Sequence, residues 1–289
     1  MGDGGLVVAN MEKEYREFTL GPVSFQLNRG RAMGLLGSNG AGKTTLLAGV
    51  AGQLALNRGS VAWNAEPIVR QAWRHREYVS YVRDIPALYG ELTVGQTMAF
   101  VARLRPTWRS GRADELLDTF RLDPHKRVRA LSRGMKAKLG LLLAASHDVQ
   151  LLLLDEVTAG IDPDTRDDIQ RFLRGLVVNH GVSVMVSSHI FEDIEQVSDD
   201  VLILRRGAPV FSGTLTQVQH LVAVTLAGDV PPALRMSRLI VGSWTGPDGT
   251  TLVLPPAFSA DQEESLQAAG AVRRPASVRD LYFAYRERS

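Results

Sequence analysis

Residues 37–44 read Gly-Ser-Asn-Gly-Ala-Gly-Lys-Thr and lie between an apolar run, residues 32–36, and a helix-like stretch. Successive backbone N–H groups curl round a phosphate only where side chains leave room, and glycines supply that freedom. The helix that follows directs its positive end at the same place. The pattern therefore predicts a nucleoside triphosphate site, with the Lys43 ammonium on the β and γ groups and the Thr44 hydroxyl on Mg²⁺.

Two carboxylates follow a second apolar run. Residues 151–154 are four leucines, a continuity typical of a parallel strand covered on both faces, and Asp155 and Glu156 come next. Acids at the carboxyl end of a central strand face the ligand. Asp155 is suited to holding Mg²⁺ through water, and Glu156 to polarising the water that attacks the γ-phosphate. The alternative is that Asp155 and Glu156 are merely solvated acids at the end of a strand. The presence of a phosphate loop in the same chain disfavours this alternative.

Three further segments carry groups that could act on a phosphate. Within residues 131–135, Ser132 and the Gly134 backbone could form a second anion site at a helix N-terminus. Residues 159–163 form a turn into a helix that starts with proline, and His189 follows a strand-like run. Taken singly, these segments are explained by a helix cap, a helix start and a structural histidine. The order and spacing of all five segments together favour a functional role.

The elements that must position these residues alternate between strand and helix patterns. Unbroken helical periodicity over about residues 91–147 predicts a helical insert. The alternation on either side of it predicts a doubly wound parallel sheet. The expected strands are 6–11, 23–27, 32–36, 60–63, 78–82, 151–154, 182–187 and 201–205, and the expected helices are 45–52, 163–178 and 191–197.

The signals weaken beyond about residue 215. Strands are expected at 221–226 and 250–254, and Ser277 is expected to cap a final helix. That helix carries four apolar or aromatic side chains on one face, Val278, Leu281, Tyr282 and Tyr285. This segment is either a regulatory ligand domain or an extension, and its apolar content favours packing or dimer contacts.

Composition limits the class of protein. The 289 residues are 45% hydrophobic and 22% charged with a net charge of +2, so no basic block indicates nucleic acid. Cysteine is absent, which excludes disulfides and thiolate metal sites and fits a reducing compartment. No signal sequence is evident, and the most apolar region, residues 139–154, is too interrupted to span a bilayer. A cytoplasmic chain is expected, so at a membrane another chain would have to cross it.

The five segments together resemble the ATP-binding subunits of ABC transporters, over residues 1 to about 215. The resemblance implies a P-loop NTPase of the ABC type: an α/β fold with a doubly wound, mostly parallel sheet, an antiparallel β subdomain and the helical insert. It makes 1–215 the ATPase domain and 216–289 a small C-terminal accessory segment. It also implies ATP hydrolysis and a head-to-tail dimer, in which ATP lies between one subunit's phosphate loop and the other's signature motif.

The resemblance assigns motifs and roles. Residues 37–45 correspond to Walker A, 131–135 to the signature motif, 151–156 to Walker B, and 159–162 to the D-loop. Tyr15 matches the aromatic that stacks on adenine, the alternative being surface packing. The implied catalytic residues are Glu156, His189 as the switch histidine, Lys43 and Asp162. The implied ATP ligands are Tyr15, Gly37, Ser38, Asn39, Gly40, Ala41, Gly42, Lys43, Thr44, Thr45, Ser132, Arg133, Gly134 and Met135. The implied Mg²⁺ ligands are Thr44, Asp155 and Asp84.

Three positions depart from the family pattern. Asp84 stands where the family usually has a Gln that helps ligate Mg²⁺ and relays the nucleotide state to the membrane partner; an acid could bind the metal, but its arm is shorter and charged. Arg133 stands where Gly is commonest, a variant associated with some bacterial drug, peptide or antibiotic exporters. Val157 replaces the usual proline after Glu156. None of these removes a catalytic group, so hydrolysis is expected to persist.

The leading hypothesis is therefore the energy-coupling ATPase of an ABC transporter, an exporter of the ABC-2 type. Its permeases would be separate integral-membrane subunits, and the chain would lie at the cytoplasmic face of the membrane as a homodimer without nucleic acid. One alternative is a soluble ABC ATPase acting on the ribosome or DNA, which would normally show paired ATPase units, long insertions or a basic linker. Another is a non-transporting regulatory or resistance protein that binds ATP without hydrolysis, against which Glu156 and His189 argue.

Overall fold

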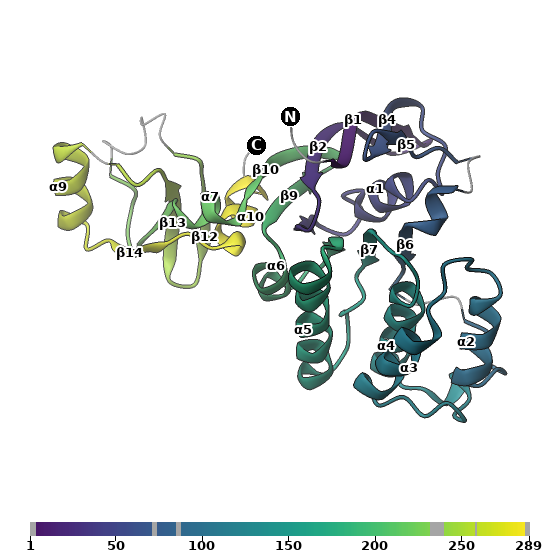
Figure 1. The fold of residues 1–289 in the computed structure, drawn as a ribbon. Coiled ribbons are helices and arrows are strands. Elements are labelled where there is room, and N and C mark those ends of the chain that lie inside the picture. The colour runs from purple at the N-terminus through teal and green to yellow at the C-terminus, as the bar shows by residue number, and fades with distance from the viewer. Residues whose placement is uncertain (1–3, 71–73, 85–87, 232–239, 258, 287–289) are drawn as a thin grey trace. The chain divides into compact units, whose positions relative to one another are not determined.

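The computed structural model describes residues 4–70, 74–84, 88–231, 240–257 and 259–286 (Figure 1). The expectation about a signal sequence concerns the N-terminus, of which residues 1–3 lie outside the described residues. The chain forms two compact units, Met1–Pro209 and Val210–Ser289.

A six-stranded sheet, in the order β10-β9-β3-β8-β7-β6, forms the centre of the first unit. Four neighbouring pairs, β3–β8, β3–β9, β6–β7 and β7–β8, are parallel, which confirms the predicted mostly parallel sheet. Every residue of β3, β7 and β8 is buried, as expected for central parallel strands covered on both faces, and this includes the polar residues Asp155, Ser183 and Ser187. The strands are β3 (Ala32–Leu36), β6 (Val79–Val82), β7 (Leu151–Asp155), β8 (Ser183–Ser187), β9 (Asp200–Arg205) and β10 (Ala208–Thr214).

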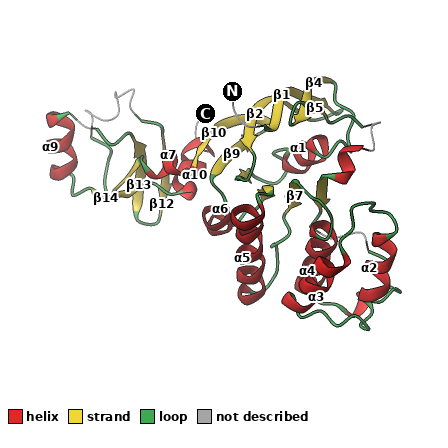
Figure 2. Ribbon diagram, in the orientation of Figure 1, coloured by secondary structure: helices red, strands yellow, loops and turns green. Residues whose placement is uncertain are grey.

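Helices connect these strands, as Figure 2 shows. α1 (Lys43–Val50) follows β3, α5 (Pro163–His180) follows β7, and α6 (Phe191–Val197) follows β8. Each predicted helix is confirmed, and α1 begins two residues earlier than its sequence pattern indicated, at Lys43. The parallel strands end at one edge of the sheet, so the loops that carry the predicted site residues lie at that edge.

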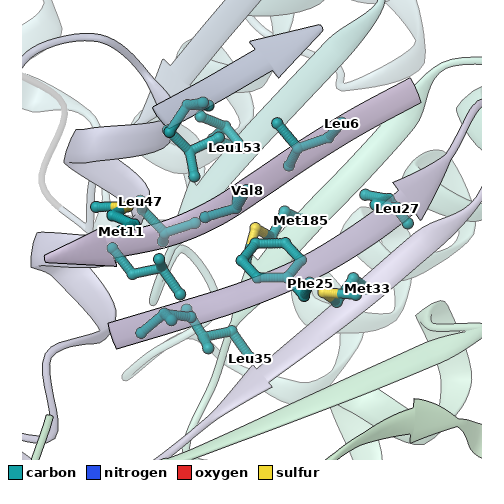
Figure 3. Close-up of a cluster of buried hydrophobic side chains, with 14 of the residues drawn as sticks. Leu6, Val8, Met11, Phe25, Leu27, Met33, Leu35, Leu47, Leu153 and Met185 are labelled. Carbon is teal, nitrogen blue, oxygen red and sulfur yellow. The ribbon is translucent and has the colours of Figure 1, made fainter. Parts of the chain in front are cut away.

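A second sheet, in the order β2-β1-β4-β5, is antiparallel. It confirms the expected antiparallel β subdomain, and it lies over the parallel sheet through a cluster of buried side chains that includes Met11, Phe25 and Met185 (Figure 3). Burying one such side chain contributes about 1.5–3 kcal/mol. The cluster thus fixes β3 and the start of α1. The strands are β1 (Gly5–Glu14), β2 (Thr19–Asn28), β4 (Arg58–Trp63) and β5 (Glu66–Pro67), and a 3₁₀ turn, η1 (Arg74–Glu77), precedes β6.

The predicted helical insert is confirmed as α2 (Val94–Ala102), α3 (Ser110–Thr119), the 3₁₀ turn η2 (Val128–Ala130) and α4 (Arg133–Ala145). Buried His147 ties the end of α4 to the sheet. Its Nδ1 lies 3.1 Å from the Glu77 carbonyl oxygen and its Nε2 lies 2.7 Å from the Ser80 hydroxyl. Burial, assisted by the positive charge of Arg105, lowers the pKa of His147 to about 4, so a neutral imidazole makes this connection at neutral pH.

The second unit contains an antiparallel sheet in the order β12-β13-β11-β14. The two strands predicted here are confirmed and pair directly, and Ser277 caps the last helix by accepting from the Asp280 N–H at 3.2 Å. A small core forms around Val224, Leu252 and Leu266. The elements are α7 (Leu215–Gln219), β11 (Val222–Leu226), β12 (Gly242–Gly246), β13 (Gly249–Leu254), α9 (Ala260–Ala268), β14 (Val272–Pro275) and α10 (Val278–Arg286). Within the described ranges, no helix has both the length and the apolarity needed to cross a bilayer.

Candidate active site

The loop between β3 and α1 forms a backbone cradle. Gly40 and Gly42 have φ values of +79° and +103°, which L side chains rarely adopt, and Gly42 is the N-cap of α1. A Cβ at Gly37 would lie 2.9 Å from the Leu204 carbonyl oxygen. Among the described residues no side chain caps the first turn of α1, so its N–H groups are available to an anion. The loop therefore fits the phosphates of a nucleotide.

Lys43 lies at the inner side of this cradle. Its side chain is buried, and its Nζ donates to the Gly37 carbonyl oxygen at 2.8 Å and lies 3.3 Å from Oε1 of Glu156. A buried ammonium needs such partners because desolvation is costly. The two contacts hold the charge between the phosphate loop and the end of β7.

Glu156 is held in an unusual backbone conformation. Its φ is +53°, in the left-handed region, which for a residue other than glycine costs on the order of 1–3 kcal/mol. Its N–H bonds to the Ser187 hydroxyl oxygen at 3.0 Å, and its Oε2 lies 2.6 Å from Nδ1 of His189. One carboxylate therefore contacts both the Lys43 ammonium and the His189 imidazole, so the three side chains form a row at the phosphate loop.

Asp155 is nearly fully buried at the end of β7. Its carboxylate accepts from the Ser187 hydroxyl at 2.8 Å and from the Tyr81 hydroxyl at 3.2 Å. Burial and the neighbouring Asp155 charge raise the pKa of Tyr81, so its hydroxyl stays a donor at neutral pH. Ser187 was not predicted as a site residue, yet it orients both Asp155 and the Glu156 backbone, and only the register of β7 and β8 places it there.

The fit to Mg²⁺ rests on Asp155 and Thr44. Among the described residues no group of three or more His, Asp or Glu side chains surrounds a metal position. Mg²⁺ is commonly held by one or two carboxylates, waters and the substrate's phosphates, so one carboxylate and one hydroxyl are a sufficient protein contribution. The exposed Thr44 at the start of α1 and the carboxylate of Asp155 satisfy that requirement. When bound, Mg²⁺ would neutralise phosphate charge.

The signature-like segment forms the start of α4. Ser132 is its N-cap and accepts from the Met135 N–H at 3.2 Å. Gly134 packs against α5, because a Cβ there would lie 2.8 Å from Cγ2 of Thr165. Asp162 caps α5 by accepting from the Thr165 N–H at 2.9 Å, a bond that lowers the pKa of its carboxyl. The described contacts of this segment are with the start of α5, with the loop before it, with Asp84 and with Lys126, and none of them is with the phosphate loop of the same chain.

Two further predicted residues, Tyr15 and Asp84, have their described contacts with residues outside the Lys43–Glu156–His189 row. Tyr15 is 47% exposed, with its ring centroid 6.3 Å from that of Phe18, so the ring is accessible for stacking. The carboxylate of Asp84, expected on Mg²⁺, pairs with the guanidinium of Arg133.

Asp193 is a buried carboxylate that was not predicted as a functional residue. It is 2% exposed and accepts from Thr158, Gln170 and Ser188, the first two at 2.6 Å and the third at 3.2 Å. Its three donors come from the loop after β7, from α5 and from the loop after β8. Asp193 therefore joins the loops that carry Glu156 and His189.

Asp193→Ala is expected to lower the free energy of unfolding by about 3–5 kcal/mol, because three buried donors lose their acceptor. Urea denaturation followed by circular dichroism measures this. Asp167→Ala, an exposed carboxylate on α5, is the control and should change the value by less than about 0.5 kcal/mol. Equal effects of the two substitutions would contradict the structural role of Asp193.

Comparison with known proteins identifies the family. The ABC transporter family profile matches residues 20–159. The chain is 31% identical over 225 residues to the daunorubicin resistance ATP-binding protein DrrA3 of Streptomyces coeruleorubidus, covering 76% of this chain and 71% of that protein. It is 29% identical over 296 residues to the Nod factor export ATP-binding protein I of Ralstonia nicotianae, covering 96% and 92%.

Another relative is matched over less of its length. The chain is 32% identical over 192 residues to the uncharacterized ABC transporter ATP-binding protein YhaQ of Bacillus subtilis, covering 65% of this chain and 63% of that protein. A solved structure described as the ATP binding subunit of an ABC transporter aligns with a TM-score of 0.68 at 27% identity, covering 74% of this chain and 92% of that one. That alignment confirms the predicted ABC-type P-loop fold. The chain therefore belongs to the ATP-binding subunits of ABC transporters, a family of ATPases.

Proposed function

We propose that this chain is the ATP-hydrolysing subunit of an exporter whose membrane-spanning part consists of separate permease subunits. The observation that carries the proposal is the row Lys43–Glu156–His189 at the phosphate loop, with distances of 3.3 Å and 2.6 Å to the two oxygens of Glu156. A row of this kind serves hydrolysis, whereas nucleotide binding alone would not need the base. The relatives named for Nod factor export and daunorubicin resistance support the direction of transport.

The chain's own groups divide the work of hydrolysis. Glu156, held by its unusual backbone, accepts the proton of the attacking water. His189 fixes the Glu156 carboxylate and faces the position of the γ-phosphate, while the Lys43 ammonium moves from Glu156 to the phosphate oxygens. Thr44 and Asp155 would hold Mg²⁺, which would neutralise phosphate charge. Tyr15 supports adenine by stacking.

The second half of each ATP site comes from another subunit. Within one chain, the described contacts of residues 132–135 are with the start of α5, the loop before it, Asp84 and Lys126 rather than with the phosphate loop. The N-terminus of α4 is an anion site of the kind that a γ-phosphate fits. Because one chain carries both halves, two copies complete two equivalent sites, and a homodimer follows. ATP favours the closed dimer because only that state offers both halves to the phosphates.

Recovery of membrane partners tests this function. Tagged Glu156→Gln protein, expressed in its native host, is trapped with ATP, solubilised in mild detergent and analysed for polypeptides that co-purify. A stoichiometric multi-span membrane protein is expected. Recovery only from the soluble fraction, with ribosomal or DNA-repair proteins or with nothing bound, would favour the soluble ATPase or the regulatory protein instead.

A further inference from the structure

Two of the positions that depart from the usual ABC motifs lie in contact. An N–H of the Arg133 guanidinium donates to Oδ1 of Asp84. The two side chains are 46% and 43% exposed, and the two residues are 49 positions apart in the sequence. Asp84 follows β6, and Arg133 is the first residue of α4. The pair therefore connects the residues that follow β6, an edge strand of the parallel sheet, with the segment proposed to bind the γ-phosphate.

The guanidinium of Arg133 also lies against the loop between β7 and α5. Gly160 in that loop has a φ of +65°, and a Cβ there would lie 3.1 Å from Nη1 of Arg133. The neighbouring Gly134 packs on the same loop, since its Cβ would lie 3.3 Å from Cγ2 of Ile161. Arg133 is thus placed between Asp84 on one side and the loop that leads to Asp162 on the other.

Electrostatics explains why the carboxylate sits there. A cation in the first turn of a helix opposes the positive end of the helix dipole, and residues 133–136 include Arg133 and Lys136 but no acid. The carboxylate of Asp84 supplies a negative charge that offsets the positive charge of the Arg133 guanidinium. The Asp84 carboxylate therefore already engages the guanidinium of the first residue of α4, and a phosphate that approached this guanidinium would be repelled by the carboxylate.

We propose that Asp84 is a positioning residue that holds Arg133 and must leave it before the γ-phosphate carried by a second copy takes its place. The inference rests on the proposed function, in which two copies form a dimer, and adds that the carboxylate of Asp84 controls the formation of that dimer. An exposed ion pair contributes little stability, so this one exchanges readily rather than locking the protein. The Asp84–Arg133 pair acts by raising the ATP concentration at which two copies form the closed dimer. The resemblance implies that Asp84 binds Mg²⁺, but in this structure its carboxylate is paired with Arg133. Arg133 therefore competes with Mg²⁺ for the Asp84 carboxylate.

The test measures the ATP concentration that gives half-maximal dimer, by light scattering at fixed Mg²⁺ and ionic strength, in Glu156→Gln protein. Asp84→Asn in that background is expected to lower the concentration about two- to tenfold, because the competing charge is removed. Asp84→Glu keeps the negative charge, so its half-maximal ATP concentration is expected to lie close to that of the Glu156→Gln parent. Arg133→Gln is expected to raise the concentration and to abolish the response to Asp84→Asn.

A matched control uses another exposed pair of the same chemistry. Asp148 and Arg109 are 48% and 61% exposed with a distance of 2.5 Å between the paired atoms, and Asp148→Asn should leave the half-maximal concentration unchanged. If Asp84→Asn fails to fold, Asp84→Gln, which introduces the residue usual in the family, replaces it. The inference would be overturned if Asp84→Asn raised the half-maximal ATP concentration, as the loss of a metal ligand would. It would also be overturned if Asp84→Asn had the same effect in protein with Arg133 and in protein with Arg133→Gln.

The parent protein separates this inference from the proposed function. If Glu156→Gln protein stays monomeric at saturating ATP, the proposed dimer fails and the role of Asp84 fails with it. If the parent dimerises but Asp84→Asn has the same half-maximal concentration, only the role of Asp84 is overturned.

Discussion

Glu156→Gln is expected to lower steady-state ATP hydrolysis by about 10²- to 10⁴-fold, because glutamine preserves the shape of the side chain but accepts no proton from water. The Lys43 ammonium loses its carboxylate partner at 3.3 Å and becomes more available to phosphate. ATP binding should therefore persist or strengthen. Phosphate release measures the rate, and isothermal titration calorimetry measures the affinity.

A neighbouring glutamate provides the control for this substitution. Glu192 is exposed in the first turn of α6, and Glu192→Gln should leave hydrolysis within about twofold of the parent. If Glu156→Gln retains more than about a tenth of the parent rate, Glu156 is not the base, and a different group must accept the proton.

Lys43→Met is expected to lower hydrolysis by about 10²- to 10³-fold and to weaken ATP binding, since the phosphates lose a buried cation that acts in a site of low dielectric. Methionine has a similar length, so the effect comes from the charge. Loss of the donor also leaves the Gly37 carbonyl oxygen, now at 2.8 Å from Nζ, without that hydrogen bond. The same two assays measure the result.

Lys138 offers a matched cation for comparison. Its side chain is 12% exposed and its Nζ lies 2.8 Å from Asp168, away from the phosphate loop. Lys138→Met should leave ATP affinity and hydrolysis nearly unchanged. If both methionine variants lose affinity equally, general electrostatics rather than the position of Lys43 accounts for the effect.

The parallel sheet and its loops were predictable because their signals are local and strong. Residues 151–154 and 32–36 are continuous apolar runs and become fully buried strands. The phosphate loop is predictable because glycine at positions 40 and 42 reflects backbone angles that other residues avoid. Lys43 and Glu156 were then predictable as site residues, because phosphates need a cation and the attacking water needs a base.

Side-chain contacts over long sequence separations were not predictable. Asp193 is buried by three donors from three segments, and nothing in its neighbourhood distinguishes it from the exposed Glu192 beside it. The pairing of Asp84 with Arg133 needs the fold to bring β6 and α4 together. In the second unit, β14 reads Val-Arg-Arg-Pro and all four residues are exposed, so it lacks the alternation that indicates a strand.

The mass of Glu156→Gln protein with and without ATP and Mg²⁺, measured by light scattering after size exclusion, tests the central claim most directly. The chain has a mass of 31.6 kDa, and the account predicts that this value doubles when ATP is added, because ATP completes a site between two copies. A protein that binds ATP by calorimetry yet keeps the mass of one chain at saturating ATP would contradict the account.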